Sequence, residues 1–282
     1  MMKAILVLAL LVYAEARITR ENCNGTVVRN IIHEKQVLKS EDYMRTPYQL
    51  AIDYNTNTLF FSFSNYQNLT FESSYINLKT NEFKIIQGPR QGFANAVDEQ
   101  SKVVYLGGMD GIYTFDYKTK VATHLDGTDH HVWELFYKKD LYYTSFEKNV
   151  YIFKNHNYHR VPELAGTKAR LVAIDNFDNI YFSNTSGLFV HEKAKGFIYF
   201  VGNHNDINGF TRNINGELFF STNEGIYYIN DKTKKVEKLI SIDDLYGVAI
   251  EADGSIIYSA EDSLFRLKPT KTYCFSNDNK NL

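Results

Sequence analysis

The side chains best suited to bind a small molecule lie at, or close to, the start of a short apolar run that the sequence repeats six times. The set combines aromatic rings with arginine, histidine, amide and carboxyl groups: Tyr48, Arg90, Phe93, Asn95, His131, Trp133, Glu134, Arg170, Asn208 and Tyr246. Aromatic rings stack on flat conjugated molecules, and cations attract carboxylates. We therefore expect these residues to bind a planar aromatic ligand that carries carboxylates, noncovalently and without a further cofactor.

The repeated run sets the spacing of the elements that must position these residues. The stretch "PYQLAIDYNTNTLFFSFS" (47–64) returns as "FANAVDEQSKVVYLGG" (93–108), and four further copies follow. The matched positions are separated by 45, 39, 38, 38 and 38 residues and are Asp53, Asp98, Tyr137, Asp175, Asn213 and Glu251. Units of about 40 residues have the pitch of propeller blades.

Each unit contains the pattern of four short strands. A small apolar run such as "LAID" or "GVAI" suits an inner strand buried on both faces. A turn rich in Asn, Asp and Gly then leads into a second strand rich in Tyr, Phe and Ile, and two further strands follow. The sequence predicts an all-β fold, a six-bladed β-propeller with four antiparallel strands per blade, over residues 17–275. A β-sandwich, or two small β domains, is the alternative.

The sixth unit lacks an outer strand, because the polar tail 276–282 follows its third strand. Residues 26–40 have the character of an outer strand but belong to no unit, so we expect this N-terminal strand to close the ring. Such closure would bring together Cys23 and Cys274, the two cysteines of the chain. We therefore expect a disulfide between them, with two free thiols as the alternative.

Residues 1–16 have the features of a secretory signal peptide: Lys3, an apolar core and a small-residue ending at Ala14 and Ala16. The apolar core is shorter than the roughly 20 residues that span a bilayer. Three N-glycosylation triplets begin at Asn24, Asn68 and Asn184. The sequence predicts a secreted, extracellular glycoprotein.

Composition limits the partners and the role of the aromatic residues. The 31 basic and 33 acidic residues give a formal net charge of −2, so we expect neither nucleic acid nor membrane as a partner. We expect much of the content of 21 Tyr and 20 Phe to fill the space between blades. The histidines of "GTDHHVWE" (127–134) are adjacent, so on a strand they point to opposite sides and are poorly placed to share a metal.

An enzymatic interpretation uses some of the same positions. Six-bladed propellers of the gluconolactonase and paraoxonase type hold a divalent cation in the channel through Glu, Asn and Asp oxygens. The equivalent positions here offer Asn95 and Glu134, joined by Asn208 or Asp206, which is a sparse ligand set. We expect no catalytic residue and no metal. A metal-dependent lactonase or esterase is the first alternative, and an extracellular protein-interaction propeller similar to the NHL or low-density-lipoprotein-receptor type is the second.

The stretch "TPYQLAIDYNTNTLFFSFS" (46–64), with "HEKQVLKS" (33–40) upstream, resembles the ommochrome-binding proteins of lepidopteran haemolymph. The resemblance covers essentially the whole mature chain, including the cysteines near its two ends. It implies a haemolymph carrier that binds an ommochrome pigment, or a tryptophan-derived precursor, noncovalently. The resemblance supplies no set of pigment-contacting residues, so the site above rests on the alignment of the repeats.

Overall fold

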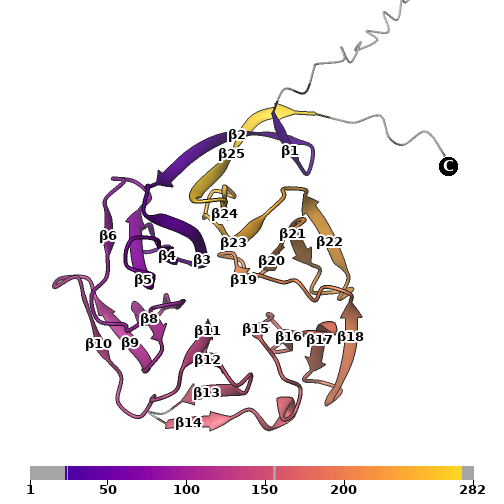
Figure 1. The fold of residues 1–282 in the computed structure, drawn as a ribbon. Helices are drawn as coiled ribbons and strands as arrows, with labels where there is room; N and C mark the ends of the chain where they lie inside the picture. The colour runs from indigo at the N-terminus through magenta and orange to yellow at the C-terminus, as the bar shows by residue number, and fades with distance from the viewer. Residues whose placement is uncertain (1–22, 24, 155–156, 275–282) are drawn as a thin grey trace, which may run out of the picture.

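Six antiparallel sheets surround a central channel in the computed structural model, which describes residue 23, residues 25–154 and residues 157–274 (Figure 1). Each sheet is one blade, and the blades follow one another around the ring in chain order, from indigo to yellow. The predicted six-bladed propeller is therefore confirmed. The predicted signal peptide and the tail 276–282 lie outside the described residues.

Every blade contributes one strand to each of four concentric positions. The innermost strands are β3 (Met44–Asp53), β7 (Ala94–Asp98), β11 (Val132–Lys138), β15 (Leu171–Ile174), β19 (Gly209–Arg212) and β23 (Leu245–Ile250). The second strands are β4 (Thr58–Asn65), β8 (Val103–Gly108), β12 (Asp140–Ser145), β16 (Ile180–Asn184), β20 (Leu218–Thr222) and β24 (Ile256–Ala260). The third strands are β5 (Thr70–Asn77), β9 (Gly111–Asp116), β13 (Val150–Lys154), β17 (Gly187–Glu192), β21 (Gly225–Ile229) and β25 (Ser263–Tyr273). The outermost strands are β6 (Phe83–Ile85), β10 (Val121–His124), β14 (Asn157–Arg160), β18 (Phe197–Gly202), β22 (Val236–Ile240) and β2 (Ile31–Ser40), and β1 (Thr26–Val28) flanks β2.

Burial falls from the inner strands to the outer ones. All four residues of β15, "LVAI", are buried, and so are all five residues of β24, "IIYSA". The outer strand β14, "NYHR", exposes every residue. A short 3-10 helix, η1 (Pro162–Leu164), connects β14 to β15, and no helix in the described part of the chain is long and apolar enough to cross a membrane. The apolar inner runs of the sequence thus form strands that are buried on both faces.

Aromatic rings fill the space between neighbouring blades, as the composition predicts. Phe60 of β4 is fully buried and meets Phe115 and Tyr117 of the next blade, with ring centroids 5.4 and 6.0 Å away. Tyr105 of β8 stacks with Tyr137 of β11 at 6.1 Å. Each blade is a separate sheet, so such side-chain contacts are the main link between neighbouring blades.

The N-terminal strand closes the ring. β2 pairs antiparallel with β25, from Ile31 opposite Tyr273 to Ser40 opposite Ser263, and so completes the sixth blade as predicted (Figure 1). Cys23 and Cys274 form the predicted disulfide across a sequence separation of 251 residues, with their Cα atoms 5.9 Å apart. Chain-entropy arguments give a loop of this length on the order of 5 kcal/mol of stabilisation.

We expect replacement of both cysteines, Cys23→Ala with Cys274→Ala, to lower the free energy of unfolding by about 2 to 5 kcal/mol, because the unfolded chain regains the entropy of an open loop. Denaturant unfolding followed by circular dichroism measures this difference. A reducing agent should destabilise the natural chain and leave the double variant unchanged. Equal unfolding midpoints for the oxidised chain and the variant would contradict the prediction.

Candidate functional site: the two ends of the central channel

The channel has two chemically different ends. At the upper end, where the innermost strands begin, aromatic side chains from different blades contact one another. At the lower end, the last residues of β3, β7, β11 and β19 and the residues that follow them line one cavity. The sequence-predicted site belongs to the upper end, because its residues lie where the innermost strands start.

The four predicted aromatic residues are brought together at the upper end. Phe93 stacks on Trp133 with ring centroids 4.7 Å apart and contacts Tyr48 at 5.2 Å. Tyr48 in turn meets the edge of Tyr246 at 5.7 Å. Phe93 is 9% exposed and the other three rings are half-buried. The array is therefore a packed cluster whose outer faces remain accessible.

Two further rings, which the alignment of the repeats did not select, extend this array. Phe71 of β5 contacts Phe93 at 5.2 Å, and Phe146, which follows β12, meets Trp133 at 6.3 Å. His131 lies parallel to Phe146 at 4.8 Å. Phe71 and Phe146 come from the region where second strands connect to third strands, and these connections return to the upper end. We name the upper aromatic array as the set Tyr48, Phe71, Phe93, His131, Trp133, Phe146 and Tyr246.

The predicted polar residues occupy different surroundings. Arg170 donates from its guanidinium to the carbonyls of Asn205 and Ile207 at 3.4 and 3.5 Å. Asn208 donates to the Leu245 carbonyl at 2.5 Å and to the Asn223 carboxamide at 2.8 Å. Arg90 is exposed, and its carbonyl accepts a hydrogen bond from the Met109 amide. None of these hydrogen bonds involves an aromatic ring of the array.

Asn95 and Glu134 are buried inside the channel. Asn95 donates to the Gln49 carbonyl at 2.9 Å and to the Ser62 hydroxyl at 3.0 Å, while its Oδ1 has no partner in the described structure. The Glu134 carboxyl accepts from the Val172 amide at 2.5 Å and is 1% exposed. Burial raises the pKa of Glu134 well above its usual range, although the Val172 amide and the Arg170 charge act in the opposite direction.

A buried layer of side chains separates the two ends. Its six members occupy equivalent steps of the innermost strands and are each less than 9% exposed: Leu50, Asn95, Glu134, Val172, Phe210 and Val248. Leu50 packs closely on Gly247: a Cβ added to Gly247 would lie 2.6 Å from Cδ1 of Leu50. Three members, Leu50, Asn95 and Phe210, form the inner wall of the lower cavity. The upper array and the lower cavity are therefore separate surfaces.

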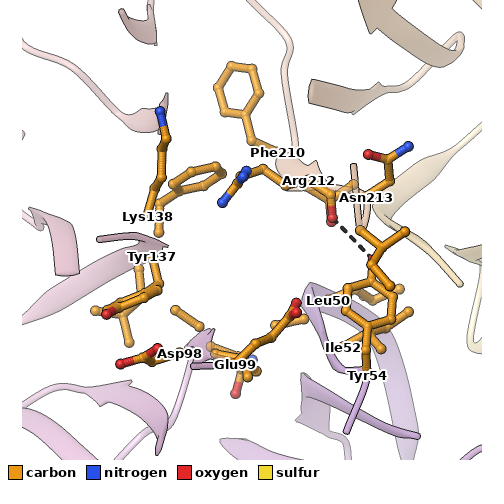
Figure 2. Close-up of a pocket in the computed structure, with 18 of the residues that line it drawn as sticks. Leu50, Ile52, Tyr54, Asp98, Glu99, Tyr137, Lys138, Phe210, Arg212 and Asn213 are labelled. Carbon is orange, nitrogen blue, oxygen red and sulfur yellow. Dashed lines mark hydrogen bonds between the residues drawn. The ribbon is translucent and has the colours of Figure 1, made fainter. Parts of the chain in front are cut away.

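The lower cavity has a volume of about 230 Å³. Arg212 and Glu99 project into it from opposite sides, and Tyr54 and Tyr137 stand at its margin (Figure 2). Tyr54 donates to the Ile250 carbonyl at 2.6 Å and lies 3.4 Å from the Arg212 carbonyl. Partial desolvation raises the pKa of Glu99; the Arg212 charge opposes this shift, and Asp53 and Asp98 add to it. Of the predicted site residues, Asn95 alone lines this cavity.

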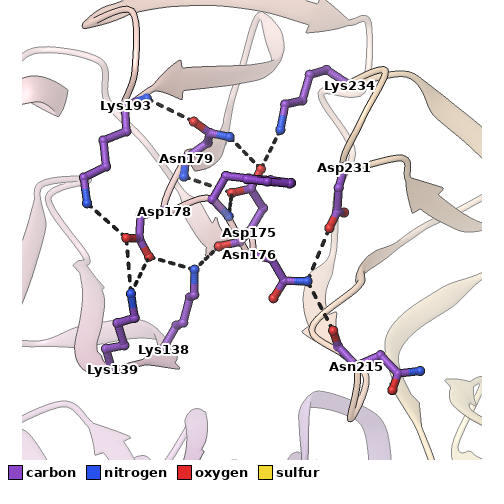
Figure 3. A network of polar contacts seen from close by, with 11 residues as sticks. Lys138, Lys139, Asp175, Asn176, Asp178, Asn179, Lys193, Asn215, Asp231 and Lys234 are labelled. Atoms are coloured by element: carbon purple, nitrogen blue, oxygen red, sulfur yellow. Dashed lines mark hydrogen bonds and ion pairs between the residues drawn. The ribbon is translucent and has the colours of Figure 1, made fainter.

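A network of lysines and aspartates borders the lower end on one side (Figure 3). Lys138 and Lys193 donate to Asp178 at 2.8 and 3.0 Å, and Lys139 approaches the same carboxylate at 3.3 Å. These hydrogen bonds, that from Lys138 first, hold the pKa of Asp178 well below its usual range. Lys234 pairs with Asp175 at 2.9 Å. Each of these four lysines therefore has a carboxylate partner within the protein.

Two of the three predicted glycosylation sites lie within the described residues. Asn68 is exposed in the turn after β4, Asn184 donates to the Thr167 carbonyl at 3.0 Å, and Asn24 lies outside the described residues. Within the described ranges, no group of three or more His, Cys, Asp or Glu residues is placed to hold a metal ion.

Comparisons with known proteins agree on family and fold. The chain is 36% identical over 250 residues to the ommochrome-binding protein of Manduca sexta, covering 86% of this chain and 90% of that protein. No family model matches the chain. A gluconolactonase from Xanthomonas campestris has a TM-score of 0.66 at 13% identity, over 88% of this chain and 96% of its own. The calcium-binding protein regucalcin from Agrobacterium tumefaciens has a TM-score of 0.64 at 14% identity, over 85% of this chain and 95% of its own. At such low identity the two solved structures share only the fold with this chain.

We expect Glu134 to make stability fall as the pH rises. The folded protein binds the carboxyl proton more tightly than the unfolded chain does, so the free energy of unfolding should fall by about 1.4 kcal/mol per pH unit above about pH 4.3 until the folded-state pKa is passed. Glu134→Gln keeps an oxygen acceptor for the Val172 amide and removes the titration. Denaturant unfolding across pH 4 to 8 should show the variant gaining stability over the natural chain as the pH rises.

The exposed residue Glu237 on β22 supplies the matched control. Glu237→Gln should leave the pH profile of stability parallel to that of the natural chain. If Glu134→Gln gave the same parallel profile, burial would not be perturbing this carboxyl.

Proposed function

The chain belongs to the ommochrome-binding protein family, and from this membership we propose that it is a secreted carrier that binds an ommochrome pigment, or a tryptophan-derived precursor, noncovalently and without chemical turnover. The upper aromatic array is the observation that carries the proposal. Ommochromes are flat and conjugated and bear carboxylate and amino groups. A surface of half-buried rings from several blades offers them a large stacking area with little conformational freedom to lose.

The accessible members of the array define where a pigment would stack. Phe93 and Trp133 already cover one another, so a ligand ring is expected on the outer faces rather than between them. Phe146 is 58% exposed and Phe71 is 36% exposed, and both flank the Phe93–Trp133 pair. We propose that the pigment lies across Phe146, Trp133 and Tyr48, which widens the predicted site to include Phe71 and Phe146.

Cations for the pigment carboxylates are available at the same end. Arg170 immediately precedes β15, and its two hydrogen bonds to main-chain carbonyls are long, at 3.4 and 3.5 Å. Its guanidinium retains donors for a carboxylate, which arginine binds through two parallel hydrogen bonds. His131 lies against Phe146 and would gain a partner in the same carboxylate. We propose these two side chains, with Arg90, as the anionic contacts.

The proposed extracellular setting has two supports. The first is the predicted signal peptide, which would direct the chain to the secretory pathway. The Cys23–Cys274 disulfide suits an oxidising compartment, where such bonds form and persist. We propose that the carrier works in the haemolymph, as the family resemblance implies.

The metal-dependent lactonase is the weaker candidate, because the buried layer provides little for a divalent cation. Leu50, Val172, Phe210 and Val248 contribute apolar side chains to it, and the Glu134 carboxyl, whose pKa burial raises, is already bonded to the Val172 amide. Hard cations prefer several charged or carbonyl oxygens in one shell. The gluconolactonase likeness is one of fold.

We expect Phe146→Ala and Trp133→Ala each to weaken binding of the ommochrome xanthommatin by about 1 to 3 kcal/mol, the range for removal of a stacked ring. The chain has a single tryptophan, so quenching of Trp133 fluorescence reports binding to the natural chain and to Phe146→Ala. Trp133→Ala lacks this fluorescence, so its binding is measured by equilibrium dialysis, with the pigment detected by its own visible absorption.

Phe177→Ala is the matched control, because Phe177 is 59% exposed and lies in the turn after β15, at the lower end. Its affinity for xanthommatin should equal that of the natural chain. Unchanged affinity in folded Phe146 and Trp133 variants would move the site away from the array. A natural chain that binds no pigment, but hydrolyses a lactone when calcium is supplied, would favour the lactonase instead.

A further inference from the structure

Arg212 breaks the pattern of the innermost strands. The residue one step before the matched position of each repeat is apolar in five blades and charged in one: Ile52, Val97, Phe136, Ile174, Arg212 and Ile250. Ile52, Val97 and Phe136 line the lower cavity together with Arg212. An arginine on an otherwise apolar ring is costly to bury unless another group pairs with its charge.

The Arg212 guanidinium has no protein partner among the residues that the structure describes. Its Nε is buried and unbonded, and no ion pair reaches it. Burial lowers the pKa of Arg212, although arginine still carries its charge at neutral pH. The lysines at the same end contrast with it, because Asp175 and Asp178 pair with them (Figure 3). Arg212 is therefore a cation that is ready to receive an anion.

The fold holds Arg212 in this position. Tyr54 is hydrogen-bonded to the neighbouring strand at Ile250 and lies against the Arg212 carbonyl. Gly216, with φ of +81°, leaves room for the guanidinium, because a Cβ at this position would lie 2.7 Å from its Nη2. The guanidinium is thus directed into the cavity by its surroundings (Figure 2).

Glu99 supplies the opposite charge across the cavity. Its main-chain carbonyl accepts from Asn55 at 2.9 Å, whereas no described residue hydrogen-bonds or ion-pairs with its carboxylate. Arg212 and Glu99 face the cavity from opposite sides without forming an ion pair with each other (Figure 2). The space between them is therefore flanked by a cation and an anion, neither of which has an ion-pair partner among the described residues.

We propose that the lower cavity is a second binding site, specific for a single α-amino acid with an apolar side chain. The ligand carboxylate would pair with Arg212, its ammonium group with Glu99, and its side chain would contact Ile52, Val97 and Phe136. The cavity volume of about 230 Å³ is below the range of roughly 300 to 1,000 Å³ for larger ligands. This size favours a single amino acid over a multi-ring pigment.

The proposal is independent of pigment binding at the other end. The buried layer lies between the lower cavity and the upper aromatic array, and its members are less than 9% exposed. A ligand in one site would not contact residues of the other. An experiment can therefore disprove amino-acid binding in the lower cavity and leave pigment binding at the upper array intact, or the reverse.

The experiment screens the twenty common amino acids at 10 mM by thermal shift, followed by calorimetric titration with L-phenylalanine and its relatives 3-phenylpropionate and phenethylamine. We expect apolar amino acids to raise Tm, and both relatives to bind at least tenfold more weakly than L-phenylalanine. Arg212→Gln and Glu99→Gln should each weaken L-phenylalanine at least tenfold. Lys232→Gln and Glu237→Gln, which remove exposed charges elsewhere, should change nothing.

Arg212→Ile separates a binding role from a structural one, because it restores the apolar residue that other blades have at this step. We expect this variant to lose amino-acid binding, retain xanthommatin affinity and unfold at a temperature at least as high as the natural chain, since a half-buried charge without an ion-pair partner is removed.

Three outcomes would overturn the proposal. The first is that no amino acid shifts Tm at 10 mM. The second is that 3-phenylpropionate binds as tightly as L-phenylalanine, which would leave Glu99 without a role. The third is that Arg212→Ile loses pigment affinity, which would assign the cavity to the pigment itself.

Discussion

Closure of the ring is the constraint on which the rest of the structure depends. Each blade is a separate sheet, and neighbouring blades are held together by side-chain contacts such as Phe60 with Phe115. The first and last blades can be held in that arrangement only if the chain ends meet. The pairing of β2 with β25 and the Cys23–Cys274 disulfide achieve this, and they do so with residues some 250 positions apart. A local turn therefore cannot substitute for them.

A closed ring also explains why one protein has two dissimilar channel ends. The six innermost strands start at one end and turn outward at the other, so residues before and after each strand gather on different faces. The buried layer fills the middle, as the crowding of side chains near the axis requires. Rings dominate the upper face, and unpaired charges distinguish the lower one. Each end has its own chemistry because packing isolates it from the other.

Features that recur in every repeat could be predicted from the sequence, whereas residues in the connections between strands could not. The spacing of six matched positions predicted the blades, the closing strand and the meeting of Tyr48, Phe93, Trp133 and Tyr246. Phe71 and Phe146 were missed because they lie outside the innermost strands, in connections whose return to the upper end depends on the fold. Glu99 was missed because an exposed glutamate after a strand is ordinary until its distant neighbours are known. Arg212 was also missed, although its departure from five apolar equivalents is visible in the aligned repeats.

That departure has a physical meaning. A sequence that specifies one fold keeps its local choices consistent with the packing, and a residue that breaks the local rule without compensation is retained for another reason. Arg212 carries a half-buried charge with no ion-pair partner among the described residues, at a step where the other blades have isoleucine, valine or phenylalanine. Asn95 is a second departure from consistent packing, because its buried Oδ1 lies in the wall of the same cavity without a hydrogen-bond partner in the described structure. Two unsatisfied polar groups in one cavity are costly for stability alone and are readily explained if a ligand satisfies them. In the upper array, by contrast, the rings pack against one another, as Phe93 does against Trp133. This stacking surface therefore leaves no buried polar group unsatisfied among the described residues of the array while its ligand is absent.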